Sequence, residues 1–251
     1  MEKPFINKIA LVTGASSGIG KATAIAFAKK GAKIVAVDCK ENNETINLIK
    51  ELGSDAIFIK CDVSKSSDVK TMIEKAIATF GQIDYAFNNA GIEGTKATTW
   101  ECSEENWDKT IGINLKGIWL CMKHEIPEML KLGKGVIINC ASVAGLIGFN
   151  GLPAYVSSKH GVVGLTKTAA LECATLGIRV NVVCPGVIQT PMIDRLTGKT
   201  KESIQQFTAL EPIGRFGLPE EIANAVVWLC SDEASFVTGH AMAVDGGFVA
   251  Q

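Results

Sequence analysis

Short apolar segments alternate with longer helical segments along almost the whole chain, and this alternation constrains the fold more than any other feature. Strands are expected at residues 8–13, 33–38, 56–60, 83–88, 136–140, 179–184 and 241–244. Helices are expected at 18–30, 43–52, 68–80, 104–132, 154–176 and 219–230. Strands that alternate with helices predict βαβ units and a parallel sheet. The strands are almost continuously apolar, which is typical of a sheet covered on both faces.

We find no linker, repeat or low-complexity stretch in the 251 residues. We therefore predict an α/β fold: a single Rossmann-like domain spanning 1–251, with a doubly wound parallel sheet of about seven strands and helices on both faces. Residues 187–218 are the exception, because they are polar in patches and contain Pro191 and Pro212. Long loops in compact domains are often lids or binding loops. We expect the part from Met192 to about Phe207 to fold over a substrate.

The composition excludes several classes of partner. The formal net charge is -1, with Lys+Arg 25 against Asp+Glu 26 and no basic block, so nucleic acid is not expected. No apolar stretch is long enough to span a bilayer. Eight dispersed cysteines without a C-x-x-C pair, and an N-terminus without a signal-peptide layout, predict a cytoplasmic protein. Three scattered histidines predict no metal site.

A glycine-rich turn, TGASSGIG, follows the first predicted strand at residues 13–20. Glycines let backbone N–H groups approach a phosphate, and the following helix N-terminus favours negative charge. A tight turn of purely structural role remains an alternative. A P-loop would need G-x-x-x-x-G-K-[ST], but Ala15 and Ala22 stand at two of its defining positions. The turn therefore predicts dinucleotide binding rather than a P-loop.

Asp38 ends the second predicted strand, eighteen residues after Gly20. A carboxylate at this place hydrogen-bonds the ribose hydroxyls of NAD and repels the 2′-phosphate of NADP. An ordinary turn residue at a strand end is the alternative interpretation. Lys40 is the only nearby cation that would weaken the preference. NAD is the predicted cofactor.

Tyr155 and Lys159 are four residues apart at the start of a predicted helix, so they share one face. A phenol is a poor base at neutral pH, and an ammonium held beside it favours the phenolate. Ser142 follows the fifth predicted strand, where its hydroxyl would orient a substrate oxygen. A Tyr–Lys pair on a helix is common by chance. Its combination with the glycine turn, Asp38 and Ser142 favours a catalytic role.

Together these motifs resemble the short-chain dehydrogenase/reductase family over essentially the full length of the chain. One departure is Ala141, where relatives often have a second serine, although Ser142 keeps its spacing to Tyr155. The matching motifs are TGASSGIG (13–20), CDVS (61–64), NNAG (88–91), Asn114 in INLKG, Ser142, Y-x-x-x-K (155–159), Pro185-Gly186 with Thr190, and DGG (245–247).

The resemblance implies roles for individual residues. Asn114, Ser142, Tyr155 and Lys159 would be catalytic, with Asn114 kinking its helix and seating a water that feeds a proton relay through Lys159 and the cofactor ribose. Asp62 would contact the adenine, Asn89 would stabilise the central strand, and the Ile188–Thr190 backbone with the Thr190 hydroxyl would hold the carboxamide. The full implied cofactor set is Gly14, Ser16, Ser17, Gly18, Ile19, Gly20, Asp38, Asp62, Val63, Asn89, Ala90, Gly91, Tyr155, Lys159, Pro185, Gly186, Ile188 and Thr190. A homotetramer is also implied.

The expected reaction transfers a hydride between NAD(H) and a secondary alcohol or ketone. The segments NNAGIEG (88–94) and CMKHEIPEML (121–130) are similar to NAD-linked dehydrogenases of cyclic or diol substrates. A small or cyclic lipophilic substrate is expected, with Glu93 and Asn150 as polar handles, because the candidate pocket residues are mostly apolar: Glu93, Gly94, Val143, Phe149, Leu152, Val187, Met192 and Leu196.

Two alternatives remain open. One is an NADPH-dependent 3-oxoacyl (carrier protein) reductase or other carbonyl reductase, which Asp38 disfavours. The other is a non-catalytic NAD-binding regulator or scaffold, which the intact set of Ser142, Tyr155 and Lys159 disfavours.

Overall fold

The computed structural model describes residues 3–251, whose strands form one parallel sheet in the order β3-β2-β1-β4-β5-β6-β7. The chain winds outward from β1 to β3 and then returns to the other side of β1, so the strand order reverses between β1 and β4. This confirms the predicted doubly wound fold. The strands are β1 (Ile9–Thr13), β2 (Lys33–Asp38), β3 (Ala56–Lys60), β4 (Tyr85–Asn88), β5 (Gly135–Cys140), β6 (Ile178–Pro185) and β7 (Ala241–Val244).

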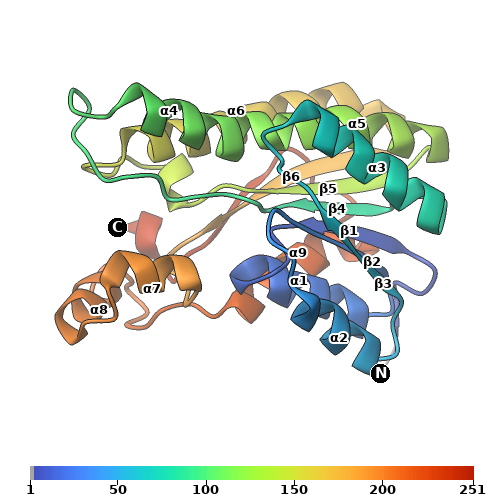
Figure 1. Ribbon diagram of the computed structural model, residues 1–251, viewed down its shortest axis with the longest axis horizontal. Helices are drawn as coiled ribbons and strands as arrows, with labels where there is room; N and C mark the ends of the chain where they lie inside the picture. The colour runs from blue at the N-terminus through green and yellow to red at the C-terminus, as the bar shows by residue number, and fades with distance from the viewer. Residues whose placement is uncertain (1–2) are drawn as a thin grey trace.

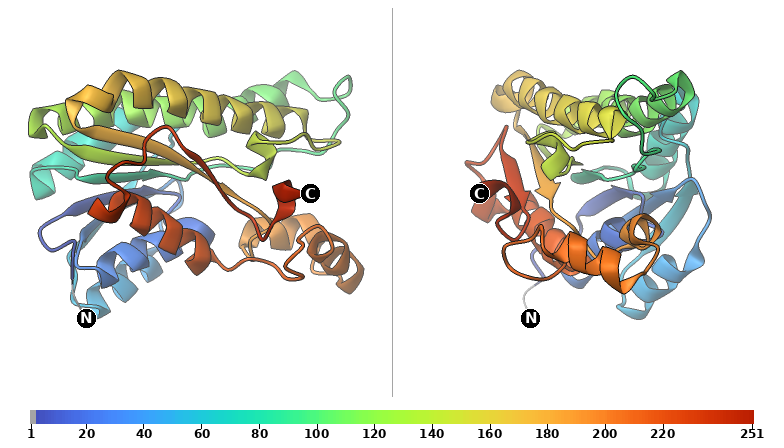
Figure 2. Two further views of the ribbon diagram at one scale, coloured as in Figure 1. Left: turned by 180° about the vertical axis from the view of Figure 1, so that it is seen from behind. Right: turned by 90° about the vertical axis from the view of Figure 1, so that its left-hand side faces the viewer.

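Helices cover both faces of the sheet (Figure 1). One layer contains α1, α2 and α9, and the other contains α3, α5 and α6, with α4 packed beside α6 (Figure 2). The bounds are α1 (Gly18–Lys29), α2 (Asn43–Glu51), α3 (Ser66–Phe80), α4 (Glu104–Ile111), α5 (Gly117–Leu132), α6 (Pro153–Cys173), α7 (Pro191–Thr197), α8 (Lys201–Thr208) and α9 (Pro219–Cys230). Within residues 3–251, no helix is both long and apolar enough to cross a membrane.

The predicted helix at 104–132 is not continuous. It breaks at a π-helical turn, Gly112–Lys116, which separates α4 from α5. Asn114 lies in this turn, and its side-chain amide bonds both the N–H and the carbonyl of Ile92. Such turns mark places where a helix departs from regular geometry to place a functional group. The break agrees with the kink implied by the resemblance.

Residues 187–218 are not a structureless loop, since they contain α7 and α8. Pro191 begins α7, where its missing N–H costs nothing. Thr200 caps α8 by accepting the N–H of Ser203. Both helices lie beyond the carboxyl edge of the sheet, at the left of Figure 1.

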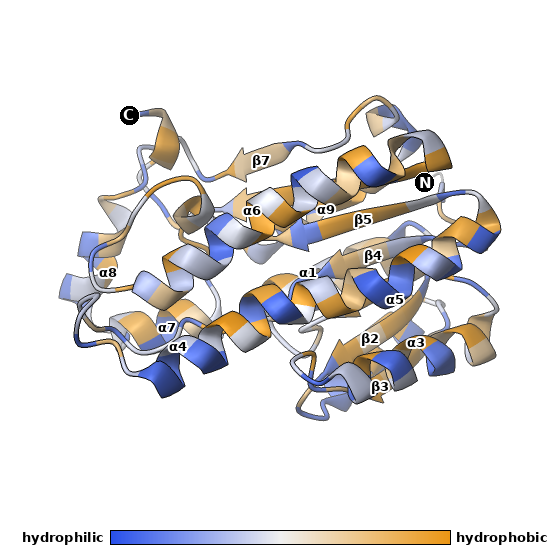
Figure 3. Ribbon diagram, turned by 90° about the horizontal axis from the view of Figure 1, so that it is seen from above, coloured by the Kyte–Doolittle hydropathy of each residue, from blue (hydrophilic) through white to orange (hydrophobic). Residues whose placement is uncertain are grey.

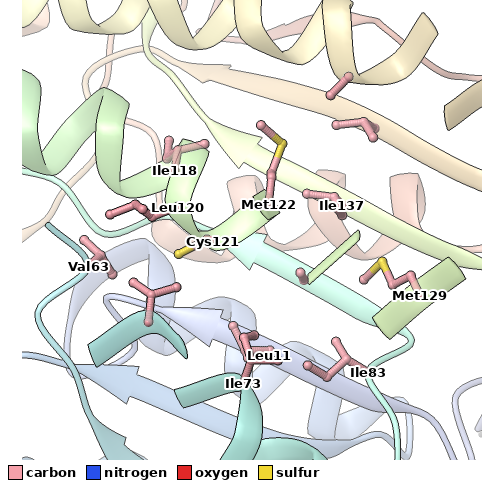
Figure 4. Close-up of a cluster of buried hydrophobic side chains, with 14 of the residues drawn as sticks. Leu11, Val63, Ile73, Ile83, Ile118, Leu120, Cys121, Met122, Met129 and Ile137 are labelled. Atoms are coloured by element: carbon pink, nitrogen blue, oxygen red, sulfur yellow. The ribbon is translucent and has the colours of Figure 1, made fainter. Parts of the chain in front are cut away.

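The core lies on both faces of the sheet. In Figure 4, Met122 and Met129 of α5 pack near Ile137 of β5, while Leu11 of β1 lies near Ile73 of α3. Seen from above, the strands are mostly hydrophobic, and hydrophilic positions gather on α3, α4 and α5 (Figure 3). This pattern accounts for the apolar strands of the sequence, because both faces of the sheet are covered.

A buried polar network crosses the α5–α6 side of the sheet. The Asn88 amide donates to Glu125 Oε2 (3.0 Å) and Asn139 Oδ1 (3.1 Å), and the Asn139 amide donates to Thr166 Oγ1 (2.9 Å). Burial raises the pKa of Glu125 to about 7. Asn88 Oδ1 and Glu125 Oε1 have no partner among residues 3–251, so a proton on Glu125 supplies a donor that this pair otherwise lacks. The network ties β4, β5, α5 and α6 together just behind the carboxyl ends of the strands.

Candidate active site

Two adjoining cavities, of about 290 and 200 Å³, lie along the carboxyl edge of the sheet, where ligands bind in open α/β folds. We call them the first and the second cavity, and together the cleft. They form one continuous cleft because both are lined by Ile19, Asn89, Gly91, Ile92, Thr190 and Met192.

The first cavity is built from the turn at the end of β1 and the N-terminus of α1. Gly14 and Gly18 have φ of 68° and 52°, and a Cβ on Gly20 would lie 2.1 Å from the Gly14 carbonyl oxygen. Ser17 precedes α1 and its side chain makes no capping hydrogen bond, and no acidic residue lies in the first turn of the helix. The first N–H groups of α1 therefore remain available to an anion. This arrangement fits the pyrophosphate of a dinucleotide.

Two carboxylates lie at the other end of the first cavity. Asp38 accepts the backbone N–H groups of Ser16 (3.1 Å) and Lys40 (3.2 Å). The hydroxyl of Ser64 donates to Asp62 and holds its pKa below the usual value. The Lys40 side chain is exposed. Negative charge at this end suits free ribose hydroxyls better than a phosphate.

The end of β4 is fastened to the end of β1. The Asn89 side chain donates to the Thr13 carbonyl (3.0 Å), and the N–H groups of Asn89 and Ala90 donate to the Thr13 hydroxyl (2.9 and 3.1 Å). These bonds fix the two strand ends at the point where the strand order reverses. The floor of the cleft is held there by hydrogen bonds rather than by packing alone.

Tyr155 and Lys159, one turn apart on α6, line the second cavity together with Ser142. Lys159 is only 4% exposed; its Nζ donates to the Cys140 carbonyl (2.8 Å) and lies 5.6 Å from the centre of the Tyr155 ring. The Ser142 Oγ accepts the N–H of Ala144 (3.2 Å), which fixes the side chain at the end of β5. The structure thus brings the three predicted catalytic side chains into one cavity.

Asn114 does not line the cleft but lies behind it. A Cβ on Gly91 would lie 3.2 Å from Asn114 Oδ1 and 3.7 Å from Lys159 Nζ, so both side chains lie close to that glycine. The Asn114 amide also donates to the Ser158 hydroxyl (3.2 Å). Its place beside Lys159 agrees with the implied location, while the water relay stays a prediction.

Of the predicted site residues, only Ser16, Gly20 and Asn114 do not line the cleft. Ser16 holds Asp38 in place, and Gly20 allows the tight turn. The others line one or both cavities: Gly14, Ser17, Gly18, Ile19, Asp38, Asp62, Val63, Asn89, Ala90, Gly91, Ser142, Tyr155, Lys159, Pro185, Gly186, Ile188 and Thr190.

Neither of the two polar residues expected to bind the substrate, Glu93 and Asn150, offers an unpaired group to the second cavity. Asn150 does not line that cavity, and neither does the pocket candidate Gly94. Glu93 lines it, but Arg195 of α7 binds its carboxylate through two nitrogens (Nε–Oε1 2.8 Å, Nη2–Oε2 3.2 Å). Burial opposes ionisation, yet the Arg195 hydrogen bonds hold the pKa of Glu93 below its usual value. Glu93 therefore closes the wall of the cleft as half of an ion pair.

Sequence reasoning did not name Ile193, Phe207, Leu210 or Phe248 as pocket residues, although Ile193 and Phe207 lie in the segment that was expected to fold over a substrate. Ile193 belongs to an apolar set at helical spacing with Met192 and Leu196, a pattern that predicts α7. Phe248 carries no such signal, because it reaches the cavity from the C-terminal segment, where its ring lies 5.7 Å from that of Phe149.

Most of the remaining lining of the second cavity is apolar, with Asn89 and Thr190 as polar exceptions, and the described residues hold no group of three or more His, Cys, Asp or Glu side chains placed to bind a metal ion. The groups in the cavity best suited to proton transfer and oxyanion binding are the hydroxyls of Ser142 and Tyr155 and the ammonium of Lys159.

Comparisons with known proteins agree with this geometry. A family model described as enoyl-(acyl carrier protein) reductase matches residues 14–249. The chain is 45% identical to a cyclohexanol dehydrogenase of Acinetobacter sp. (strain SE19), covering 100% of this chain and 98% of the relative. It is 43% identical to a 3-oxoacyl-[acyl-carrier-protein] reductase of Thermotoga maritima, covering 96% and 98%. The crystal structure of levodione reductase superposes with a TM-score of 0.93 at 35% identity, covering 98% of this chain and 99% of that one. The chain belongs to the short-chain dehydrogenase/reductase family.

Proposed function

We propose that this protein is an NAD-dependent dehydrogenase that interconverts secondary alcohols and ketones and prefers small or cyclic lipophilic substrates. The observation that carries the proposal is the meeting of Ser142, Tyr155 and Lys159 in an apolar cavity that continues into a dinucleotide-shaped cleft ending at Asp38. The chemistry needs both cavities, because the substrate carbon must lie next to the cofactor.

Tyr155 exchanges the proton of the substrate oxygen in this mechanism. Lys159 Nζ holds a positive charge 5.6 Å from the centre of the Tyr155 ring, and Ser142 donates a hydrogen bond that steadies the developing oxyanion. Among residues 3–251, Lys159 Nζ has one hydrogen-bond partner, the Cys140 carbonyl, which leaves N–H groups for the cofactor ribose and a water. A bound nicotinamide cofactor would supply or accept the hydride.

The lining of the second cavity supports a lipophilic substrate. Ser142 and Tyr155 offer two hydroxyls that would bind a single substrate oxygen, and the only carboxylate of the lining, Glu93, is neutralised by Arg195. Apolar side chains form most of the remaining wall: Val143, Phe149, Leu152, Val187, Met192, Ile193, Leu196, Phe207, Leu210 and Phe248. Similarity to a cyclohexanol dehydrogenase supports a ring-shaped alcohol.

The cofactor preference follows from charge. Asp38 and Asp62 place two carboxylates at the ribose and adenine end, where a 2′-phosphate would be repelled. A second candidate, an NADPH-dependent 3-oxoacyl (carrier protein) reductase, is favoured by the 43% identity to such an enzyme. Comparing kcat/KM for NADH and NADPH separates the two. A strong preference for NADPH would overturn the proposed cofactor.

We also propose a cytoplasmic homotetramer. The described chain leaves all eight cysteines free, which suits a reducing compartment. Large apolar side chains are exposed on one helical layer, with Leu171 of α6 82% exposed and Trp107 and Trp119 on α4 and α5 also uncovered. Such patches mark interfaces. Light scattering coupled to gel filtration measures the assembly, and a monomer at micromolar concentration would refute this part of the proposal.

A spectrophotometric screen tests the reaction. Formation of NADH is followed with cyclohexanol, open-chain secondary alcohols, diols, sugars and hydroxysteroids. The highest kcat/KM is expected for cyclohexanol-like alcohols. Absence of turnover with every alcohol and ketone, despite NADH binding, would favour the regulator or scaffold.

A further inference from the structure

The segment from Gly186 to Thr190 leaves β6 and runs along the second cavity, and Thr190 at its end lines both cavities. Three backbone hydrogen bonds hold it: the N–H of Gly186 donates to the Val244 carbonyl (3.1 Å), the N–H of Gln189 donates to the Gly217 carbonyl (2.8 Å), and the N–H of Gly217 donates to the Val187 carbonyl (2.9 Å). These bonds join the segment to β7 and to the approach to α9. The segment therefore depends on distant parts of the chain for its position.

A further anchor is a side chain. The N–H of Val187 donates to Oε1 of Glu211, a residue that is 4% exposed and lies three positions after the end of α8. A carboxylate buried to this extent needs hydrogen-bond donors to offset its lost hydration. A backbone N–H that bonds a charged acceptor is held more firmly than one that bonds a carbonyl.

Two glycines make the space that this carboxylate occupies. A Cβ on Gly186 would lie 2.6 Å from Glu211 Oε1, and a Cβ on Gly246 would lie 3.1 Å from Glu211 Oε2. The carboxylate is thus wedged between the segment that leaves β6 and the turn that follows β7. This gives a physical reason for glycine in both the PG and DGG motifs of this chain.

The Glu211 bond leaves the neighbouring donors free. Within residues 3–251, the N–H groups of Ile188 and Thr190 have no hydrogen-bond acceptor, and both residues line the cleft. Leu210, next to Glu211 in the chain, also lines the second cavity. Glu211 therefore connects the end of α8, which borders the substrate, to the segment that presents these free N–H groups.

We propose that Glu211 is a positioning residue that holds the Gly186–Thr190 segment in place for the nicotinamide half of the cofactor. It does so by accepting the Val187 N–H, and it couples this segment to the end of α8. The inference rests on the proposed function, in which Ile188 and Thr190 bind the carboxamide.

The test compares two ligands in Glu211→Ala, Glu211→Gln and wild type. NADH carries the nicotinamide, whereas ADP-ribose keeps both riboses and the pyrophosphate and lacks only the nicotinamide. It therefore retains the contacts with the glycine turn, Asp38, Asp62 and Lys159 but has no carboxamide for the Ile188 and Thr190 N–H groups. The Kd for NADH is expected to rise about tenfold in Glu211→Ala, while the Kd for ADP-ribose stays unchanged. Glu211→Gln keeps an acceptor oxygen and is expected to bind NADH within about twofold of wild type. Glu202→Ala, on the exposed face of α8, is the control and should change neither Kd.

Two outcomes would overturn the inference. One is a Kd for NADH in Glu211→Ala equal to that of wild type, and the other is an equal loss of affinity for NADH and ADP-ribose, which indicates a purely structural role. If Glu211→Ala fails to fold, Glu211→Asp, which is one methylene shorter, replaces it; wild-type NADH binding by that variant would refute the positioning role. A wild-type protein that binds NADPH instead would refute the proposed cofactor, and the same comparison with NADPH would still decide the role of Glu211.

Discussion

The floor and the cap of the cleft are held in different ways. The floor consists of the carboxyl ends of β1, β4 and β5 with the first turns of α6, and its polar side chains Asn88, Asn139 and Lys159 are buried and hydrogen-bonded. The cap, residues 191–210, contains α7 and α8; no residue of α8 is buried, and Leu196 and Leu210 are each 41% exposed. The groups proposed for chemistry thus lie on the tightly held part of the molecule, and much of the surface proposed to select the substrate lies on the loosely held part.

The anchors of the cap explain this difference. The ion pair of Glu93 and Arg195 joins it to the floor, but the Arg195 side chain is 60% exposed. Exposed ion pairs contribute below about 1 kcal/mol each. Buried networks such as that of Asn88 and Glu125 are more costly to disturb, because an unpaired polar group remains behind. We therefore expect changes in the floor to affect chemistry and stability strongly and changes in the cap to affect mainly KM.

The largest effect is expected for Tyr155→Phe. Removing the hydroxyl that we propose exchanges the proton should lower kcat by about 10³-fold, while the Kd for NADH remains within about twofold. Steady-state kinetics on the best alcohol and NADH fluorescence measure the two quantities. The matched control is Tyr85→Phe, because Tyr85 is the only other tyrosine and lies in the core. Unchanged turnover in Tyr155→Phe would disprove the mechanism.

The second prediction is that the free energy of unfolding depends on pH through Glu125, a buried residue of the floor. Burial raises its pKa from 4.5 to about 7, so the folded state favours the neutral acid. This stabilisation is complete below pH 4.5 and is lost as the pH rises to about 7, a loss of about 3 kcal/mol. Urea unfolding at pH 5 and pH 8 measures it.

Glu125→Gln should remove this part of the pH dependence, since its amide stays neutral and offers a donor to Asn88. Glu105→Gln, an exposed residue of α4, serves as the control and should leave the pH dependence as it is. If Glu125→Gln retains the full difference between pH 5 and pH 8, the buried acid is not its source.

Asp38 ends β2 and lines the first cavity, and its substitution should give an effect of intermediate size. Asp38→Ser removes the carboxylate that would bind the ribose hydroxyls and repel a 2′-phosphate. The ratio of kcat/KM for NAD to that for NADP is expected to fall about thirtyfold, corresponding to about 2 kcal/mol. Asp55→Ser removes an exposed carboxylate outside the cleft and is the control. An unchanged ratio would mean that Asp38 does not read the ribose.

The smallest effect is expected in the cap. Arg195→Gln breaks the ion pair with Glu93 and should raise KM for the alcohol by up to about fivefold, with kcat and the free energy of unfolding nearly unchanged. Wild-type KM should rise with salt, whereas that of the variant should not. Lys201→Gln, at the exposed start of α8, controls for the lost charge. If Arg195→Gln lost as much kcat as Tyr155→Phe, the proposed difference in role between the floor and the cap would be wrong.

The sequence by itself determined the doubly wound fold, the glycine turn, Asp38 and the Ser142–Tyr155–Lys159 set. These features were predictable because they depend on local order: strand and helix periodicity, a turn directly after a strand, and two side chains one helical turn apart. The resemblance to the family then placed Asn114 and the Pro185–Thr190 region near the same edge of the sheet.

Only the tertiary structure decided how distant residues meet. Glu93 and Arg195 are 102 positions apart, and their pairing turned an expected polar handle into a closed wall. The burial of Glu125 beside Asn88 depends on contacts between elements. The same holds for the bond from Val187 to Glu211, 24 positions later in the chain. No periodicity encodes such pairs, because each side chain gains its partner only when the chain has folded.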